Sequence, residues 1–189
     1  MKKKLTENIK NSTVIKIVVT GAFNSGKTHF IRTISNNNML YTEKSISEPY
    51  VVTKKSTTVA MDFAKVKLKD TPQLFFFGTP GQKRFDFMWE ILSYKMFGCI
   101  IMVDSHKFYE SFDDTRTILN YFIDLSTVPI VVVANKQDLP NALSPHKIKQ
   151  ELSLPKRVSV LPCIATEKDK VEEISRYLVN NIIASKKDL

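Results

Sequence analysis

The residues whose types and spacing best suit chemistry form a glycine-rich run near the start of the chain. Residues 21–28 read G-A-F-N-S-G-K-T, which matches the phosphate-loop pattern G-x-x-x-x-G-K-[ST]. In such a loop, successive backbone N–H groups and the N-terminus of the following helix bind nucleotide phosphates. The Lys27 ammonium is expected to span the β- and γ-phosphates, and the Thr28 hydroxyl to bind Mg²⁺. The predicted phosphate-side residues are Gly21, Asn24, Ser25, Gly26, Lys27, Thr28 and His29.

A second run suited to binding lies further along the chain, where residues 135–138 read N-K-Q-D directly after an apolar stretch. The Asp138 carboxylate can accept hydrogen bonds from N1–H and the 2-amino group of guanine, a donor edge that adenine lacks. Adenine would leave that carboxylate unpaired, so the motif predicts GTP in preference to ATP. We expect Asn135 to brace the phosphate loop and the aliphatic part of Lys136 to lie along the base.

Both motifs need a scaffold of alternating strands and helices. Short apolar runs typical of strands buried on both faces occur at 14–20, 74–77, 99–103 and 130–134. Helices are expected at 27–35, 82–96, 110–125, 145–152 and 170–184. Strands that alternate with helices predict an α/β fold, with a mostly parallel sheet covered on both faces. The glycine-rich run then falls between a strand and a helix, which favours a phosphate loop over a chance match.

One pair of expected strands breaks this alternation. Residues 58–68 and 74–77 are joined by the turn-like K-D-T-P at 69–72. This arrangement predicts a hairpin that adds one antiparallel edge strand to a six-stranded, mostly parallel sheet. Functional loops are expected at the carboxyl ends of the parallel strands.

The composition fits a single domain of this kind. The chain has 189 residues, and 43% of them are hydrophobic, which is enough for one buried core. The abundant Ile, Val, Leu and Phe exclude a disordered chain. We expect a basic tail at 1–12, one domain at 13–184 and a short tail at 185–189.

The cysteines and the chain ends predict a cytoplasmic protein without a membrane anchor. Cys99 and Cys163 lie in apolar stretches, which indicates reduced core thiols rather than a disulfide framework or a metal site. No apolar run approaches the roughly 20 residues that a membrane helix requires. Position 2 is Lys and the last residues are K-K-D-L, so no lipid anchor is expected at either end.

The net charge of +9 is spread over several short lysine-containing stretches. Such a charge could attract nucleic acid or an anionic membrane surface, or it could keep the protein in solution while serving one anionic ligand. None of the clusters is dense or alternates with aromatic residues as nucleic-acid binders commonly do, so no nucleic-acid partner is expected.

With both motifs in place, the sequence resembles the small Ras-like GTPases over nearly its whole length. Residues 58–63, T-V-A-M-D-F, look like the first switch segment, and residues 78–85, G-T-P-G-Q-K-R-F, look like the second. The resemblance implies the three-layer P-loop NTPase fold of a Ras-like G domain. It also implies a GTP/GDP molecular switch that uses Mg²⁺ and hydrolyses GTP slowly until a partner accelerates the reaction.

The resemblance also implies roles for single residues. Thr58 would close over Mg²⁺ and the γ-phosphate, the Gly81 N–H would contact the γ-phosphate, and Gln82 would orient the attacking water. Lys27, Thr58 and Gln82 are thus the implied catalytic residues, with Thr28 and Thr58 as the magnesium ligands. The Ala165 N–H, in a loose counterpart of the family's S-A-K loop, would donate to guanine O6.

The switch stretches look most like a prokaryotic branch of these GTPases. That branch is similar to the gliding-motility polarity GTPases and to GTPases encoded beside roadblock/LC7-domain proteins. The resemblance therefore implies a roadblock-type partner. Phe85, Phe87 and Trp89 follow Gln82 at spacings that cannot all face inward on one helix, so they are expected either to form a partner-binding patch or to thicken the core locally.

Several positions depart from the family pattern. Gly78 stands where the second switch normally carries an Asp that holds Mg²⁺ through water, and its loss is expected to weaken Mg²⁺ binding. Asp104 either compensates or is an ordinary residue at a strand end. Phe23 replaces a glycine and would crowd an arginine finger from a partner. Asn24 stands where K⁺-activated GTPases place an ion-coordinating asparagine, or it is present for its backbone conformation alone.

These departures keep a second function open. In that alternative the chain is a nucleotide-binding interaction module, a pseudo-GTPase in which GTP or GDP is structural and hydrolysis is negligible. Gly78 and Phe23 both favour it.

Overall fold

The computed structural model describes residues 14–38, 40–46, 57–81, 85–125 and 127–185. At its centre lie three parallel strands whose sequences are nearly continuous apolar runs: β1 (Ile15–Gly21), β5 (Gly98–Asp104) and β6 (Ile130–Asn135). Almost all of their residues are buried. These strands do not alternate apolar and polar residues, as a strand with one solvent-exposed face does, because helices cover them on both sides.

The strands form one sheet in the order β2-β3-β4-β1-β5-β6-β7. β4 (Gln73–Gly78) pairs in parallel with β1, and β7 (Ser159–Pro162) pairs in parallel with β6. β3 (Thr57–Lys67) and β2 (Leu40–Ile46) extend the other edge as antiparallel strands. The carboxyl ends of β1, β5 and β6 therefore lie at the same edge of the sheet, where ligand-binding loops are expected in an α/β fold.

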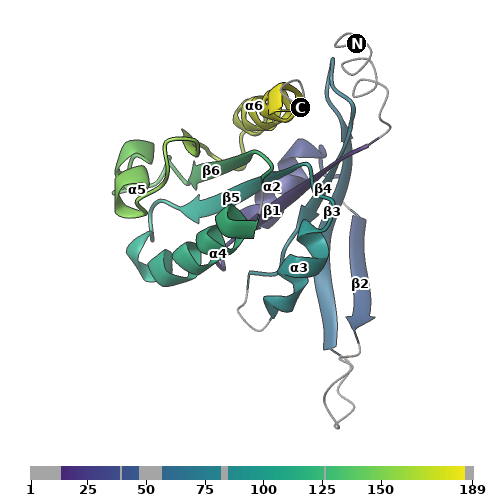
Figure 1. The fold of residues 1–189 in the computed structure, drawn as a ribbon, viewed down its shortest axis with the longest axis horizontal. Coiled ribbons are helices and arrows are strands. Elements are labelled where there is room, and N and C mark those ends of the chain that lie inside the picture. Colours follow the sequence, from purple (N-terminus) through teal and green to yellow (C-terminus); the bar gives the residue numbers. More distant parts are fainter. Residues whose placement is uncertain (1–13, 39, 47–56, 82–84, 126, 186–189) are drawn as a thin grey trace.

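The helices divide into two layers. They are α2 (Lys27–Ile34), α3 (Phe87–Ser93), α4 (Phe112–Leu125), α5 (Pro145–Glu151) and α6 (Lys168–Ser185), with a short 3-10 turn, η2 (Tyr109–Ser111). α2 and α6 cover one face of the sheet, and α3, α4 and α5 cover the other (Figure 1). Neighbouring residues of β1 show the division, since Ile17 packs in the first core cluster and Val18 in the second.

The predicted α/β architecture is confirmed, with a mostly parallel sheet and an antiparallel edge. The hairpin predicted for residues 58–68 and 74–77 is present as β3 and β4. The described residues add β2 as a seventh strand beyond that hairpin. The helix predicted at 82–96 is shorter where it is described, because α3 ends at Ser93 and Lys95 has a left-handed backbone with φ of 54°. Across the described ranges, every helix is too short or too polar to span a bilayer.

Candidate nucleotide site

The phosphate loop joins β1 to α2, so strand, loop and helix follow one another as its motif requires. Gly21 has φ of 145° and Gly26 has φ of 102°. A Cβ on Gly21 would lie 2.2 Å from the Met102 carbonyl oxygen, and a Cβ on Gly26 would lie 2.2 Å from Asn135 Nδ2. Both positions therefore need glycine, for the backbone conformation and for the close approach of a neighbour.

Lys27 is a buried cation at the first position of α2. Its Nζ donates to the carbonyl oxygens of Gly21 at 2.8 Å and Ala22 at 2.7 Å. Burial lowers the pKa of Lys27 to about 8, and attraction to the Asp62 carboxylate partly offsets that effect. A buried ammonium at a helix N-terminus, with the backbone of a glycine-rich loop around it, favours an anionic ligand.

Thr28 has a carboxylate beside it. Its hydroxyl donates to Asp62 Oδ2 at 2.6 Å. Asp62 belongs to β3, and Gly78 is the last residue of the neighbouring strand β4. A Cβ on Gly78 would lie 2.9 Å from Asp62 Cβ and 3.3 Å from Asp62 Oδ2. The hydroxyl predicted to bind Mg²⁺ thus faces a carboxylate from β3 rather than from β4.

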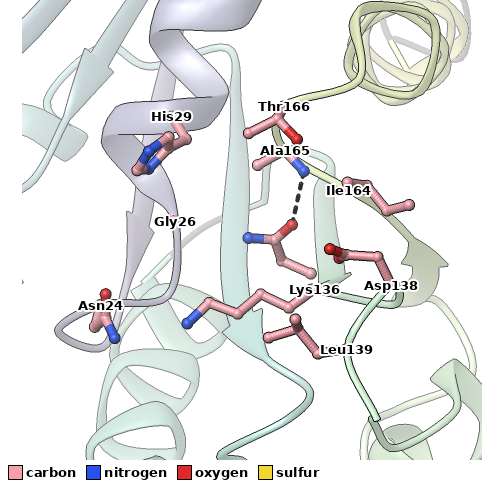
Figure 2. A pocket seen from close by; sticks show the side chains of 10 residues that line it. Asn24, Gly26, His29, Lys136, Asp138, Leu139, Ile164, Ala165 and Thr166 are labelled. Atoms are coloured by element: carbon pink, nitrogen blue, oxygen red, sulfur yellow. Dashed lines mark hydrogen bonds between the residues drawn. The ribbon is translucent and has the colours of Figure 1, made fainter.

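Asn135 connects the phosphate loop to the loop that follows β7. Only 3% of its surface is exposed. Its Nδ2 donates to the Ser25 carbonyl oxygen at 2.9 Å, and its Oδ1 accepts a hydrogen bond of 2.9 Å from the Ala165 N–H, which Figure 2 shows as a dashed line. One amide side chain therefore fixes the spacing between two loops that are far apart in the sequence.

A pocket of about 180 Å³ opens beside Asn135 (Figure 2). Its lining residues are Asn24, Gly26, His29, Asn135, Lys136, Asp138, Leu139, Ile164, Ala165 and Thr166. The pocket therefore gathers predicted residues from the phosphate loop, from the N-K-x-D motif and from the 163–166 loop. Asp138 is exposed at its rim. The Lys136 side chain extends across the pocket toward Asn24, and its Nζ pairs with Asp104 Oδ2 at 2.5 Å.

The Ala165 N–H, implied by the family resemblance to donate to guanine O6, already has an acceptor in Asn135 Oδ1. The Ala165 carbonyl oxygen accepts from Thr33 Oγ1 of α2 at 2.7 Å. Both polar groups of this peptide unit thus hold the loop in place. A base at this position would have to share the N–H or displace Asn135 Oδ1.

A second pocket, of about 460 Å³, lies on the other side of the phosphate loop. Lys27, Thr28, Asp62 and Gly81 are among its lining residues. A Cβ on Gly81 would lie 2.8 Å from Lys27 Nζ, so the Gly81 backbone sits next to the buried cation. Phe23 also lines this pocket and is 67% exposed.

Asn24 has φ of 62°, a left-handed conformation that asparagine adopts more readily than most residues. This geometry supports the interpretation that asparagine serves the loop backbone, and it gives no separate support to K⁺ coordination. Asp104 Oδ1 accepts hydrogen bonds from the N–H groups of His106 and Lys107. Asp104 thus caps a turn at the end of β5, which supports the second interpretation of that residue.

Two implied catalytic residues cannot be placed by their side chains. Gln82 lies outside the described residues, and so does the side chain of Thr58. The Thr58 backbone lies in β3, in register with Ser45 of β2.

Of the two interpretations left open for Phe85, Phe87 and Trp89, the structure supports local thickening of the core. Phe85 and Trp89 are buried in the core cluster beneath α3 and α4, and Phe87 is half-buried against the same cluster. Ile91 and Tyr94 are instead the exposed large apolar residues here, at 57% and 67%. The phase of α3 explains the difference, since position 91 lies outside the helix face that carries the buried Met88, Trp89 and Leu92.

Asp62 is the functional candidate that sequence reasoning missed. It stands in the stretch T-V-A-M-D-F, for which the family resemblance implies a role only for Thr58. The predicted hairpin brings the two strands together, but only its register identifies the residue opposite Asp62. In the observed register Phe63 pairs with Phe77, so the next pair along the two strands is Asp62 with Gly78.

The donors at the phosphate side suit Mg²⁺. Among the described residues there is no cluster of three or more His, Cys, Asp or Glu side chains that could hold a metal alone. Mg²⁺ in nucleotide sites commonly uses one or two protein oxygens together with phosphates and water. The Thr28 hydroxyl and the Asp62 carboxylate, next to Lys27 and the phosphate loop, match that requirement.

Comparisons with known proteins agree with this geometry. The sequence matches the profile of the Arf family, the ADP-ribosylation factor family, across residues 1–182. It is 26% identical to ADP-ribosylation factor-like protein 3 of Saccharomyces cerevisiae over 181 residues, which are 90% of this chain and 87% of that protein. It is also 30% identical to the uncharacterised protein MJ1339 of Methanocaldococcus jannaschii over 125 residues, 66% of this chain and 71% of that one.

Solved structures show the same fold. The structure of the Arl6 BBS3 small GTPase of Trypanosoma brucei, with the bound nucleotide analogue GppNp, superposes with a TM-score of 0.66 at 19% identity. The match covers 90% of this chain and 98% of that one. The match to the family profile extends over nearly the whole sequence, and the phosphate loop and N-K-x-D motif converge on one site. The chain therefore belongs to the ADP-ribosylation factor family of small GTPases.

Proposed function

We propose that this protein is a GTP/GDP switch that binds its nucleotide with Mg²⁺ and hydrolyses GTP slowly unless a partner accelerates the reaction. The observation that carries the proposal is that the two pockets adjoin. Asn24, Gly26 and His29 line both of them. A nucleotide with its base beside Asp138 and its phosphates beside Lys27 would cross from one pocket into the other along these three residues.

Guanine selection is assigned to Asp138. Its carboxylate offers two acceptors to the N1–H and 2-amino group of guanine. Xanthine, the base of the nucleotide XDP, differs from guanine by a carbonyl at C2 in place of that amino group. Asp138→Asn supplies a donor to that carbonyl, so the variant is expected to lose affinity for GDP and gain affinity for XDP. Competition binding with GDP, XDP and ADP tests this, with Asp70→Asn in the β3–β4 turn as the matched loss of one carboxylate. Equal preference for GDP and ADP in the unaltered protein would refute the guanine assignment.

Hydrolysis is assigned to in-line attack of water on the γ-phosphate. Lys27 and the loop N–H groups would stabilise the charge that develops on the phosphate oxygens, and Gln82 would orient the water. Bound Mg²⁺ would neutralise phosphate charge. Single-turnover GTP hydrolysis by the unaltered protein and by Gln82→Leu tests the role of Gln82. A slower variant is expected, and equal rates would remove Gln82 from the reaction.

The pseudo-GTPase remains the second candidate because Phe23 is exposed beside the phosphate-side pocket. A bulky ring there hinders entry of a partner's arginine. If the protein retains intact GTP for days and Phe23→Gly does not make hydrolysis sensitive to any partner, the structural role of the nucleotide is favoured over the switch.

The remaining part of the proposal is a partner protein that binds the switch segments. The resemblance of the switch stretches to GTPases linked with roadblock/LC7 proteins supports a partner of that type. The exposed Ile91 and Tyr94 after the second switch offer apolar contact area for it. Pull-down with the GTP-loaded and GDP-loaded forms is expected to retain the partner with one form only, and Tyr94→Ser is expected to weaken the capture.

A further inference from the structure

The second switch of this chain begins with Gly78 and therefore brings no carboxylate of its own to the magnesium side of the site. A site that relies on few protein oxygens is sensitive to the loss of one negative group. The arrangement of β3 and β4 provides another source for that group.

Asp62 lies directly across the strand pair from Gly78. The antiparallel register that joins Phe63 to Phe77 continues to Asp62 and Gly78. The two residues point to the same side of the sheet, because a Cβ on Gly78 would come within 2.9 Å of Asp62 Cβ. The Asp62 Oδ2 atom lies 3.3 Å from that Cβ position, so the carboxylate fills space into which a side chain at position 78 would extend.

The contact between Asp62 and Thr28 gives the carboxylate a chemical task. A hydroxyl that donates its hydrogen to a carboxylate has its lone pairs directed elsewhere. Thr28 Oγ1 donates to Asp62 Oδ2 at 2.6 Å. Its lone pairs are then available to a cation, and the negative charge of Asp62 lies within one hydrogen bond of the ligand oxygen.

The surroundings of Asp62 contain the cation and the open volume that a metal–phosphate ligand requires. Asp62 lines the same pocket as Lys27, Thr28 and Gly81. The Asp62 carboxylate attracts the Lys27 ammonium, so the negative group and the phosphate-binding cation act on one another in this pocket.

We propose that Asp62 is the carboxylate of the Mg²⁺ site, and that it replaces, from the neighbouring strand, the side chain that Gly78 lacks. The proposal rests on the nucleotide-binding function proposed above. Asp62 has two roles in this proposal. It orients the Thr28 hydroxyl, and it adds negative charge on the side of the Mg²⁺ ion that faces the protein. The glycine at position 78 is then required by the carboxylate at position 62, because both side chains cannot occupy the same space.

The test measures how Mg²⁺ slows the release of a fluorescent GDP analogue, over a series of free Mg²⁺ concentrations. Asp62→Asn keeps the shape of the side chain and removes its charge. We expect it to raise the Mg²⁺ concentration for half-maximal retention by about 10- to 100-fold, the usual effect of losing a group that supports a metal ligand. Asp70→Asn removes one charge from the exposed turn of the same hairpin and is expected to leave this concentration unchanged.

An exchange variant makes the test specific. Asp62→Gly with Gly78→Asp moves the carboxylate to β4 and removes the Cβ contact of 2.9 Å. We expect this double variant to recover most of the Mg²⁺ sensitivity. Gly78→Asp alone is expected to bind Mg²⁺ no better than the unaltered protein, because Asp62 Cβ and Ile31 Cδ1 each lie 2.9 Å from the new Cβ.

A measurement on the unaltered protein keeps the proposal falsifiable if a variant does not fold. With ¹³C-labelled aspartate and bound GDP, Mn²⁺ in place of Mg²⁺ is expected to broaden the carboxyl resonance of Asp62 and leave that of Asp70 sharp. Failure of the unaltered protein to bind GDP would refute the proposed function. Two results would overturn the carboxylate assignment alone. One is that Mg²⁺ strengthens GDP retention equally in the unaltered protein and in Asp62→Asn, and the other is a sharp Asp62 resonance with Mn²⁺.

Discussion

Replacing Asn135 with alanine tests whether one amide side chain holds the base-side and phosphate-side loops together. The substitution removes the hydrogen bond to the Ser25 carbonyl oxygen and the one from the Ala165 N–H, both 2.9 Å long. Ser25 and Ala165 are buried, so solvent cannot readily replace the lost partner. The expected result is a folded protein with lower stability and weaker guanine nucleotide binding.

The magnitude follows from the two groups that lose their partner. Leaving one buried polar group unpaired costs about 1–3 kcal/mol, so we expect the free energy of unfolding to fall by about 3–4 kcal/mol. For a domain of this size, that corresponds to a decrease in melting temperature of roughly 6–16 °C. The comparison variant is Thr33→Val, which removes a single hydrogen bond of 2.7 Å to the same loop and is expected to cost about 1 kcal/mol.

The assay is urea unfolding of protein stripped of nucleotide, followed by circular dichroism. Nucleotide must be removed because a ligand that binds the folded state adds its own free energy to the measured stability. A second titration with GDP then measures the binding contribution separately. If Asn135→Ala lowers the free energy of unfolding by no more than Thr33→Val does, the bridging role assigned to Asn135 is refuted.

Two further predictions concern buried titratable groups. The pKa of Lys27 is about 8 in the folded protein against 10.5 for an ordinary lysine, so the unfolded chain binds more protons between these values and stability should rise with pH across that window. Urea unfolding from pH 7.5 to 10.5 should show the unaltered protein gaining about 3 kcal/mol of stability relative to Lys27→Met, and a stability difference that does not change with pH would contradict it. Burial raises the pKa of Cys99 far above its usual range and that of Cys163 to about 12, so neither is thiolate at pH 8. Titration with a thiol reagent at that pH should find two slow thiols in the folded protein and two fast ones in urea, and a fast thiol in the folded state would show that one of these sites is open.

The parts of the fold that depend on local pattern could be predicted from the sequence. The buried strands of the centre are continuous apolar runs, and the motifs at 21–28 and 135–138 each follow one of them. Because parallel strands end at the same edge of the sheet, these motifs had to meet there. Asn24, Gly26, Asn135 and Asp138 line one pocket for that reason.

The features that sequence reasoning missed depend on register and helix phase. The contact of Asp62 with Thr28 requires a particular pairing of β3 with β4, and a shift by one residue would turn Asp62 to the other face. The burial of Trp89 and the exposure of Ile91 depend on the orientation of α3 about its axis. Neither property is contained in residue types and spacing alone.

The pairing of β3 with β4 also bears on how such a site can change during evolution. In the site proposed above, a carboxylate on either strand would serve the same hydroxyl, but only one would fit, since the Cβ positions at 62 and 78 are 2.9 Å apart. A lineage that moves the charge from one strand to the other must pass through a sequence with two crowded acids or with none. The two arrangements are therefore separated by a disfavoured intermediate, and we expect homologues to carry one acid or the other as a correlated pair. On this proposal, a search that demands an acid at the position of Gly78 would discard members of this family that carry the magnesium-side carboxylate on β3 instead.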